Sequence, residues 1–191
     1  TSLGRFLREA AQVVIDKSGR VVIYSGDDSY FEYLSRWVSD SRYEPHAPES
    51  NKNILDSGTL SVAKCEEDGR LVWIPLIYGR AGLTPDNGFH SQADVLLEAR
   101  RAADISDATP MDRPEDVEVS PVTGRVYAML TKNKKRSTDT DGVNSRAKNH
   151  YGQVLEMIPP GPVGDVSHIA DEFQWEVFLL GGNPEEPEHG A

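Results

Sequence analysis

The sequence predicts an all-β fold, a partial β-propeller of about two blades with one short inserted helix. Short β-branched runs alternate with glycine-containing turns, and long polar segments separate the hairpins. One hairpin pattern occurs twice: in residues 9–21 and 115–126 an acid precedes a β-run, and the turn ends in Gly-Arg-Val. Because a propeller repeats a unit of about four strands, two such copies indicate two neighbouring blades. Chance similarity between two ordinary hairpins is the alternative.

The first blade is expected over residues 9–78, where turns containing glycine join the runs in the manner of hairpins. Its expected strands are residues 12–15, 20–24, 30–38, 59–65 and 70–74. Residues 39–58 are polar, contain proline and show no period, so we expect a surface excursion there. We interpret residues 1–191 as a single partial propeller domain, with a frayed acidic tail at 183–191.

The second blade is expected over residues 111–182, after a helical or loop insertion at 79–110. Within the insertion, Ser91 and Asp94 have the spacing of a capping box, which predicts one helix over residues 92–104. The expected strands of the second blade are residues 115–119, 125–130, 154–158 and 173–180, with a long polar loop at 131–150.

Composition excludes several classes of protein. The chain carries 31 acidic and 20 basic residues, a formal net charge of −11. Such a charge repels phosphodiester backbones and anionic lipid, so we expect neither nucleic-acid nor membrane-surface binding. The longest apolar stretch, residues 71–78, is far shorter than the roughly 20 residues that span a bilayer. The single cysteine, Cys65, excludes an internal disulfide and is expected to be a core thiol.

The repeated hairpin selects two glutamates as a candidate metal site. Glu9 and Glu115 begin equivalent inner strands, whose ends lie beside the central channel of a propeller. Carboxylates that converge there repel each other unless a cation lies between them, and calcium accepts several oxygen ligands from distant loops. The alternative is that each glutamate is simply solvated, which is the commonest environment of this residue.

Arg113-Pro114-Glu115 adds a candidate phosphate contact. Proline restricts its neighbour to extended conformations, so Arg113 and Glu115 are expected on the same side of the strand. A guanidinium beside a metal-binding carboxylate can hold a phosphate bidentately. A local ion pair between Arg113 and Asp112 or Asp116 is the alternative.

Other catalytic patterns are absent from the sequence. The five histidines lack the spacing of zinc motifs, and neither a Walker loop nor a GxSxG elbow occurs. Asp27 and Asp28 could supply oxygen ligands, although acidic turns are common. The basic run at residues 132–136 is expected to be a solvated loop that attracts anions weakly.

Several segments of the chain resemble the PhoX family of alkaline phosphatases. They occur in family order and cover nearly the whole chain, and residues 111–118 are the most specific stretch. The segments are Arg5-Phe6 with Glu9, residues 19–28 with Phe31 and Tyr33, and residues 58–63, 108–118, 144–147 and 173–176.

The resemblance implies a six-bladed propeller with a calcium- and iron-containing cluster, which hydrolyses phosphate monoesters in the periplasm or outside the cell. By position, Glu9 and Glu115 match metal-ligating glutamates, and Arg113 matches the arginine that contacts phosphate. One departure is Arg8, where the family usually has histidine; its positive charge is expected close to the cluster.

The resemblance also implies that the chain is a piece of a longer protein. Further metal ligands of the family, including a cysteine that Cys65 does not match, fall outside residues 1–191. The isolated chain is therefore expected to bind calcium weakly, to lack phosphatase activity, and to need other blades or self-association. A calcium-dependent propeller lactonase or esterase, or a non-catalytic binding propeller, are the alternatives.

Overall fold

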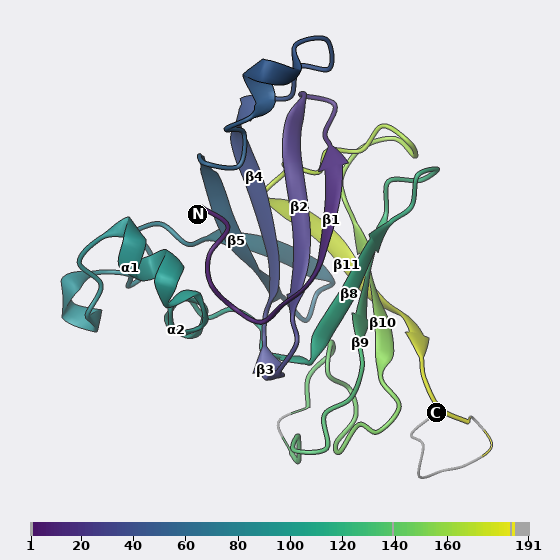
Figure 1. Cartoon of the computed structure of the whole chain (residues 1–191). Helices are drawn as coiled ribbons and strands as arrows, with labels where there is room; N and C mark the ends of the chain where they lie inside the picture. Colours follow the sequence, from purple (N-terminus) through teal and green to yellow (C-terminus); the bar gives the residue numbers. More distant parts are fainter. Residues whose placement is uncertain (1, 139, 184, 186–191) are drawn as a thin grey trace.

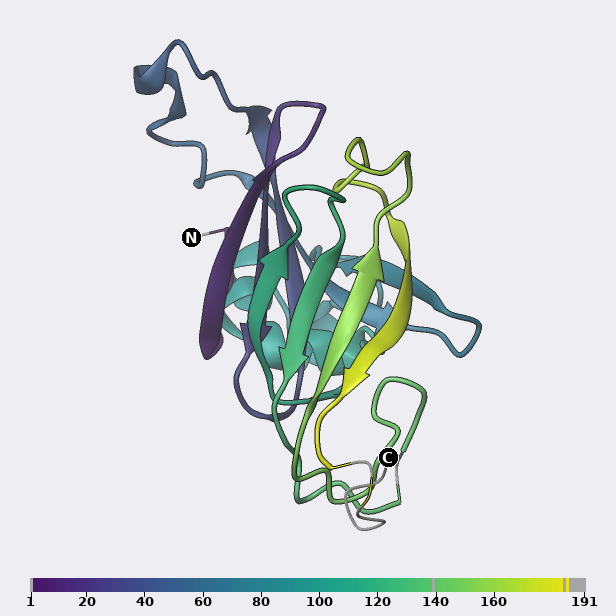
Figure 2. The same cartoon turned by 90° about the vertical axis from the view of Figure 1, so that its right-hand side faces the viewer.

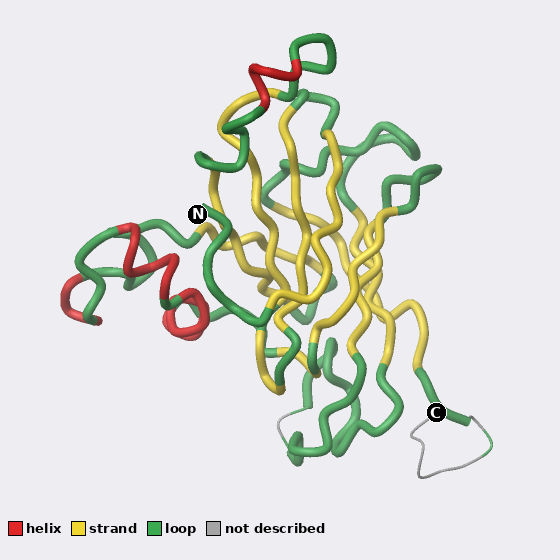
Figure 3. The backbone as a smooth tube through the Cα atoms, in the orientation of Figure 1, coloured by secondary structure: helices red, strands yellow, loops and turns green. Residues whose placement is uncertain are grey.

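A computed structural model describes residues 2–138, 140–183 and 185. Strands are the main regular structure of this part of the chain, and the two α-helices lie together on one side of them (Figure 3). None of the helices among these residues has the length and apolar character needed to cross a bilayer. Most of the expected frayed tail, residues 184 and 186–191, lies outside the described residues.

Nine strands form one antiparallel sheet in the order β1-β2-β4-β5-β6-β11-β10-β9-β8. They are β1 (Arg8–Ile15), β2 (Arg20–Asp27), β4 (Leu34–Arg42), β5 (Gly58–Cys65), β6 (Arg70–Pro75), β8 (Pro114–Val119), β9 (Val126–Leu130), β10 (Gln153–Ile158) and β11 (Glu172–Leu180). A second, two-stranded sheet pairs β3 (Tyr30–Glu32) with β7 (Met111–Asp112). The large sheet curves until β1 and β2 contact β8, so it is nearly closed (Figures 1 and 2). The all-β prediction is confirmed, and the number of blades stays a prediction.

The two copies of the repeated sequence form equivalent hairpins. Strand β1 pairs with β2, and β8 pairs with β9, each through a turn whose glycine has positive φ: 83° at Gly19 and 74° at Gly124. The first strand of each hairpin also contains a bulge, which interrupts the register after Glu9 in β1 and after Pro114 in β8. The sequence repeat thus corresponds to a repeated local structure.

The expected third strand, residues 30–38, is in fact two strands. Phe31 has φ of 65°, in the left-handed region, and the register of β3 against β7 shifts there, so residues 30–38 do not form one continuous extended run. The chain forms β3 first and then β4, which continues to Arg42, into the segment expected as a surface excursion. The rest of that excursion contains one 3₁₀ turn, η1 (Pro48–Asn51).

The prediction of one inserted helix is wrong, because the segment forms two: α1 (Gln92–Leu97) and α2 (Ala99–Ile105). The predicted cap is confirmed, since the Ser91 hydroxyl accepts a hydrogen bond from the Asp94 amide at 3.2 Å. The break lies at Glu98, whose ψ of 45° is not helical. Arg101 packs 4.0 Å from the Phe89 ring, so a tertiary contact helps to set the direction of α2. A short 3₁₀ turn, η2 (Pro85–Asn87), precedes α1.

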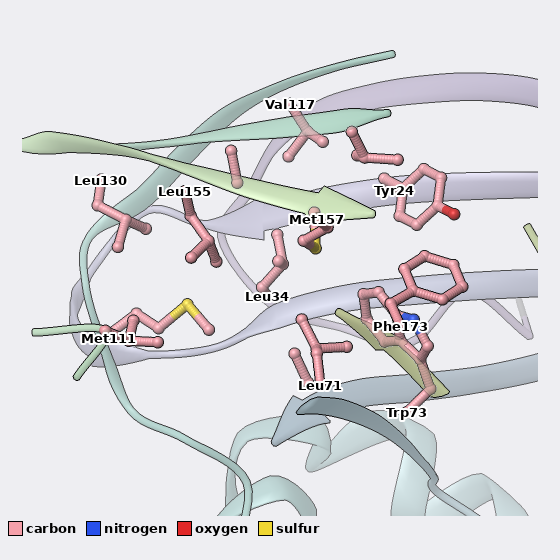
Figure 4. Packing of buried hydrophobic residues seen from close by; sticks show 14 of the residues in the cluster. Tyr24, Leu34, Leu71, Trp73, Met111, Val117, Leu130, Leu155, Met157 and Phe173 are labelled. Carbon is pink, nitrogen blue, oxygen red and sulfur yellow. The ribbon is translucent and has the colours of Figure 1, made fainter. Parts of the chain in front are cut away.

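Two apolar clusters stabilise the fold. The larger fills the space inside the curved sheet, where side chains from both halves meet (Figure 4). Its labelled members are Tyr24, Leu34, Leu71, Trp73, Met111, Val117, Leu130, Leu155, Met157 and Phe173. The smaller cluster joins the helices to the outer face of β2, β4 and β5, with Trp37, Val95 and Ala102 among its buried residues. Burial of apolar surface on both faces therefore holds the sheet in its curved shape.

A buried polar network ties the first hairpin to the loop before β11. Asp16 accepts a hydrogen bond from the His168 amide at 2.7 Å, and the Tyr24 hydroxyl lies 3.0 Å from His168 Nδ1. Arg36 donates to the carbonyls of His168 and Ala170. Burial lowers the pKa of His168 from 6.5, since the positive form is poorly solvated there.

We expect the free energy of unfolding to decrease as the pH falls below about 6.5. His168 binds a proton more weakly in the folded chain than in the unfolded chain. Its contribution to the free energy of unfolding is therefore fully present above the unfolded pKa and is lost as the pH falls below that value. His168→Gln should flatten this part of the pH profile, measured by urea unfolding. His46→Gln, an exposed site, is the control, and an equal effect there would contradict the assignment.

The closest approach of the two hairpins is at Gly26 in β2. A Cβ atom at this position would overlap the carbonyl oxygens of Pro114 and Glu115 in β8. Gly26 is also the register partner of Glu9 in β1. One residue without a side chain therefore lies between the two glutamates that the sequence selects.

Gly26→Ala should lower the free energy of unfolding by about 3 kcal/mol, because the added methyl group must push β8 away from β2. Urea unfolding followed by circular dichroism measures the change. Gly79→Ala is the control: it has no neighbour within 4 Å and pays only for its positive φ, about 1 kcal/mol. Equal losses at the two sites would show that β2 and β8 are not in close contact.

Candidate functional site

The candidate site lies where the bulged ends of β1 and β8 meet across Gly26. A bulge tilts the strand and redirects a side chain, and bulges are frequent beside functional sites. Glu9 is exposed, and within the described residues it makes neither an ion pair nor a side-chain hydrogen bond. Ala10, which follows Glu9, has φ of 61°, so the bulge holds the chain in an unusual conformation.

Arg8 makes its side-chain contacts with the N-terminal segment and with β2. Its guanidinium donates to the Ser25 hydroxyl and to the Leu3 carbonyl, both at 2.6 Å, and packs 4.1 Å from the Phe6 ring. Burial lowers the pKa of Arg8, although the nearby Asp27 carboxylate favours the charged form. The side chain thus anchors the N-terminal segment against β2.

Arg113 lies between two carboxylates. Its Nη2 atom is 2.8 Å from Asp28 Oδ1 and 3.3 Å from Glu115 Oε1. The expected alternative partners, Asp112 and Asp116, do not pair with it. The three side chains are each about a quarter exposed, so solvent and small ligands reach them.

The N–H donors of Arg113 are not used in hydrogen bonds within the described chain. The contact with Asp28 is close but does not have hydrogen-bond geometry, and Oδ1 of Asp28 has no hydrogen-bond donor. Glu115 Oε1 accepts its hydrogen bond from the Thr131 hydroxyl instead, at 2.6 Å. The closest contacts to both carboxylates are made by Nη2, whereas Nε and Nη1 make no hydrogen bond within the described residues and are the donors available to a ligand.

The route by which Arg113 and Glu115 come together differs from the expected one. The residue before a proline is normally extended, but Arg113 has φ of 54°, in the left-handed region. The proximity that was predicted from extended spacing is confirmed, while the conformation is not. Thr131 donates its amide to the Arg113 carbonyl, which helps to retain this uncommon backbone.

A buried ion pair lies next to the site, because Asp112 directly precedes Arg113 in the chain. Arg136 Nε donates to Asp112 Oδ1 at 2.7 Å, and both side chains are almost completely buried. Asn149 donates to the other carboxylate oxygen of Asp112 at 3.3 Å. The expectation that residues 132–136 are a solvated loop is therefore wrong for Arg136, because its charge is needed to satisfy Asp112.

Two cationic side chains, Arg113 and Lys135, lie near the ring of Tyr30. Arg113 Cζ lies 5.7 Å from the ring centroid, and Lys135 Nζ lies 4.9 Å from it. Tyr30 reaches this place because β3 pairs with β7, where Tyr30 is the partner of Asp112. Sequence reasoning missed Tyr30, Lys135 and Thr131, since only the pairing of β3 with β7 and the return of the 131–150 loop place them here.

The carboxylates at the site are Glu9, Asp28 and Glu115, with oxygen donors of the kind that calcium prefers. Asp27, the other acidic candidate, forms a bidentate pair with Arg100 and is buried. No group of three or more metal-ligating side chains is assembled within residues 2–138, 140–183 and 185. Since calcium takes roughly six to eight oxygens, these residues fit the ion in kind but not in number.

Three other features of the chain are not part of this site. A cavity of about 930 Å³ is lined by the N-terminal segment, β5 and α1, and it includes neither Glu9, Arg113 nor Glu115. Cys65 packs against the central apolar cluster, where burial raises the pKa of its thiol, in line with the expected core role. Burial raises the pKa of the Glu32 carboxyl to about 7. The ion pair of Glu32 with Arg100, at 3.4 Å, opposes this shift.

Comparison with known proteins identifies clear relatives. The family model described as alkaline phosphatase PhoX matches residues 1–191. Among solved structures, the chain is similar to Pseudomonas fluorescens PhoX in complex with vanadate, a transition state analogue, with 39% sequence identity and a TM-score of 0.92. The match covers 98% of this chain and 34% of the other, so the chain spans about a third of that protein. Comparison with curated proteins gives no match.

Proposed function

Because the chain belongs to the PhoX family of alkaline phosphatases, we propose that it supplies part of the active site of a phosphomonoesterase. The observation that supports the proposal most directly is that Arg113 is paired with carboxylates but makes no side-chain hydrogen bond in the described part of the chain. Its charge is held between Asp28 and Glu115, yet its N–H donors make no hydrogen bond within the described chain. Such a guanidinium is suited to a phosphate, which offers several acceptor oxygens in a matching geometry.

The residues of this chain position the phosphate rather than attack it. Arg113 donates two parallel hydrogen bonds to phosphate oxygens and remains paired electrostatically with Asp28 and Glu115. Thr131 fixes the Glu115 carboxylate through its hydroxyl, and therefore fixes the partner of Arg113. Donors placed in advance stabilise the charge that develops in phosphoryl transfer without later reorganisation.

We propose Glu9 and Glu115 as ligands of the calcium and iron that the resemblance implies. The exposed carboxylate of Glu9 and the second oxygen of Glu115 are the donors this chain contributes, on either side of Gly26. When bound, such ions neutralise phosphate charge and act as Lewis acids. The remaining ligands lie outside this chain in our proposal, and inactivity of residues 1–191 alone remains a prediction. A periplasmic or secreted location and a six-bladed propeller are parts of the same proposal.

The geometry favours a phosphate ester over a neutral ester or lactone. A phosphate monoester is already a dianion in its ground state and needs positive charge near its oxygens to bind, whereas a neutral ester or lactone develops a single negative oxygen only during the reaction. Assays of the full-length protein with p-nitrophenyl phosphate and p-nitrophenyl acetate, each with and without a chelator, separate these classes. Turnover of the acetate alone would contradict the proposal, and turnover of neither would favour the non-catalytic propeller.

Arg113→Ala in the full-length protein should lower kcat/KM for p-nitrophenyl phosphate about 100-fold, as loss of one preorganised donor group does. The metal content should stay unchanged, because Arg113 is not a ligand. Arg80→Ala removes an exposed arginine outside the site and is the matched control. Equal activity of the two variants would rule out the role proposed for Arg113.

Glu115→Gln should reduce metal content and activity together, because a neutral amide is a poorer ligand than a carboxylate. Elemental analysis of the purified full-length protein and the phosphatase assay measure the two effects. Glu118→Gln, an exposed change on the same strand, should alter neither. Full metal content in Glu115→Gln would show that this carboxylate is not a ligand.

A further inference from the structure

Lys135 is the second cation near Tyr30, and its surroundings differ from those of Arg113. Within the described residues, no carboxylate lies within ion-pair distance of its ammonium group, and Nζ donates no hydrogen bond. Arg113, by contrast, is in contact with two carboxylates. We propose that Lys135 is a second cationic contact for the substrate phosphate, an inference that rests on the proposed phosphomonoesterase function.

The excess of carboxylates over cations at the site favours a second cationic contact for an anionic substrate. Asp28 and Glu115 together outweigh the single charge of Arg113, and Glu9 adds another carboxylate across Gly26. A phosphate monoester carries up to two negative charges; ions bound by Glu9 and Glu115 would offset those two carboxylates, but not Asp28 or the net negative charge of the chain as a whole, which repels the anion. An ammonium that no acid neutralises offsets this repulsion and raises the local concentration of the anion.

Tyr30 is the feature that keeps Lys135 close to Arg113. Both cations lie within 6 Å of the same ring centroid, so they are at most about 11 Å apart. The Tyr30 ring attracts an ammonium through its quadrupole without cancelling its charge, as a carboxylate would. Lys135 therefore has a preferred position and keeps its ability to bind an anion.

The backbone at Lys135 is fixed by a hydrogen bond and by the burial of the next residue. Its amide donates to Asn133 Oδ1 at 3.0 Å, and the next residue, Arg136, is buried against Asp112. Arg136 packs 4.9 Å from the ring of Phe31, beside the contact of Lys135 with Tyr30. Two successive cations of the loop thus pack on two successive aromatic residues, which fixes Lys135 relative to β3 and so to the site.

The test uses steady-state kinetics of the full-length protein with p-nitrophenyl phosphate, and inhibition by inorganic phosphate. Lys135→Met should raise both KM and the phosphate inhibition constant about three- to tenfold, while kcat changes less than about twofold. The difference from the unmodified protein should shrink at high ionic strength, because salt screens an exposed cation. A purely structural role of Lys135 would not produce this salt dependence.

Three further variants complete the experiment. Lys135→Arg keeps the charge and should restore KM, whereas Tyr30→Leu removes the ring and should raise KM in the same direction as Lys135→Met. Lys134→Met, an exposed lysine of the same loop, is the matched control. If Lys135→Met behaves like Lys134→Met, or if Lys135→Arg is as impaired as Lys135→Met, the proposal is wrong. If Arg113→Ala also has no effect, the proposed function itself fails, so the two failures are distinguishable.

Discussion

The backbone of Gly26 lies against the carbonyls of Pro114 and Glu115, at a place that no side chain can occupy. This contact brings the first hairpin onto the second, and the other features of the site depend on it. Asp28 follows two residues after Gly26 and reaches Arg113, while Glu9 pairs with Gly26 from the opposite strand. If the two hairpins separated, the site would lose both its ion pair and the proximity of its glutamates.

Three unusual backbone conformations lie in or beside the site. Ala10 follows Glu9, Phe31 follows Tyr30, and Arg113 is itself part of the site; all three have positive φ without being glycine. Such conformations cost of order 1–3 kcal/mol each and persist only where surrounding structure requires them. Here the buried pair of Asp112 with Arg136 and the packing of the central cluster supply that requirement.

Sequence patterns predicted the hairpins, the all-β class and the proximity of Arg113 to Glu115, because those depend on local runs, turns and short spacing. They could not predict Tyr30, Thr131 or Lys135 as neighbours, since strand pairing between β3 and β7 and a returning loop bring them together. The break at Glu98 and the burial of Arg136 likewise depend on tertiary contacts. Glycine at position 26 is visible in the sequence, but only the close approach of β8 explains why no other residue fits there.

The central claim is that Gly26 joins two hairpins into a site where Arg113 binds phosphate between the flanking glutamates. A crystal structure of the full-length protein with orthovanadate tests this most directly, because vanadate adopts the geometry of the transferring phosphoryl group. We expect the vanadate oxygens within hydrogen-bond distance of the Arg113 guanidinium, on the side of the site that Glu9 and Glu115 share. Vanadate bound elsewhere, with Arg113 still held only by Asp28 and Glu115, would contradict the claim.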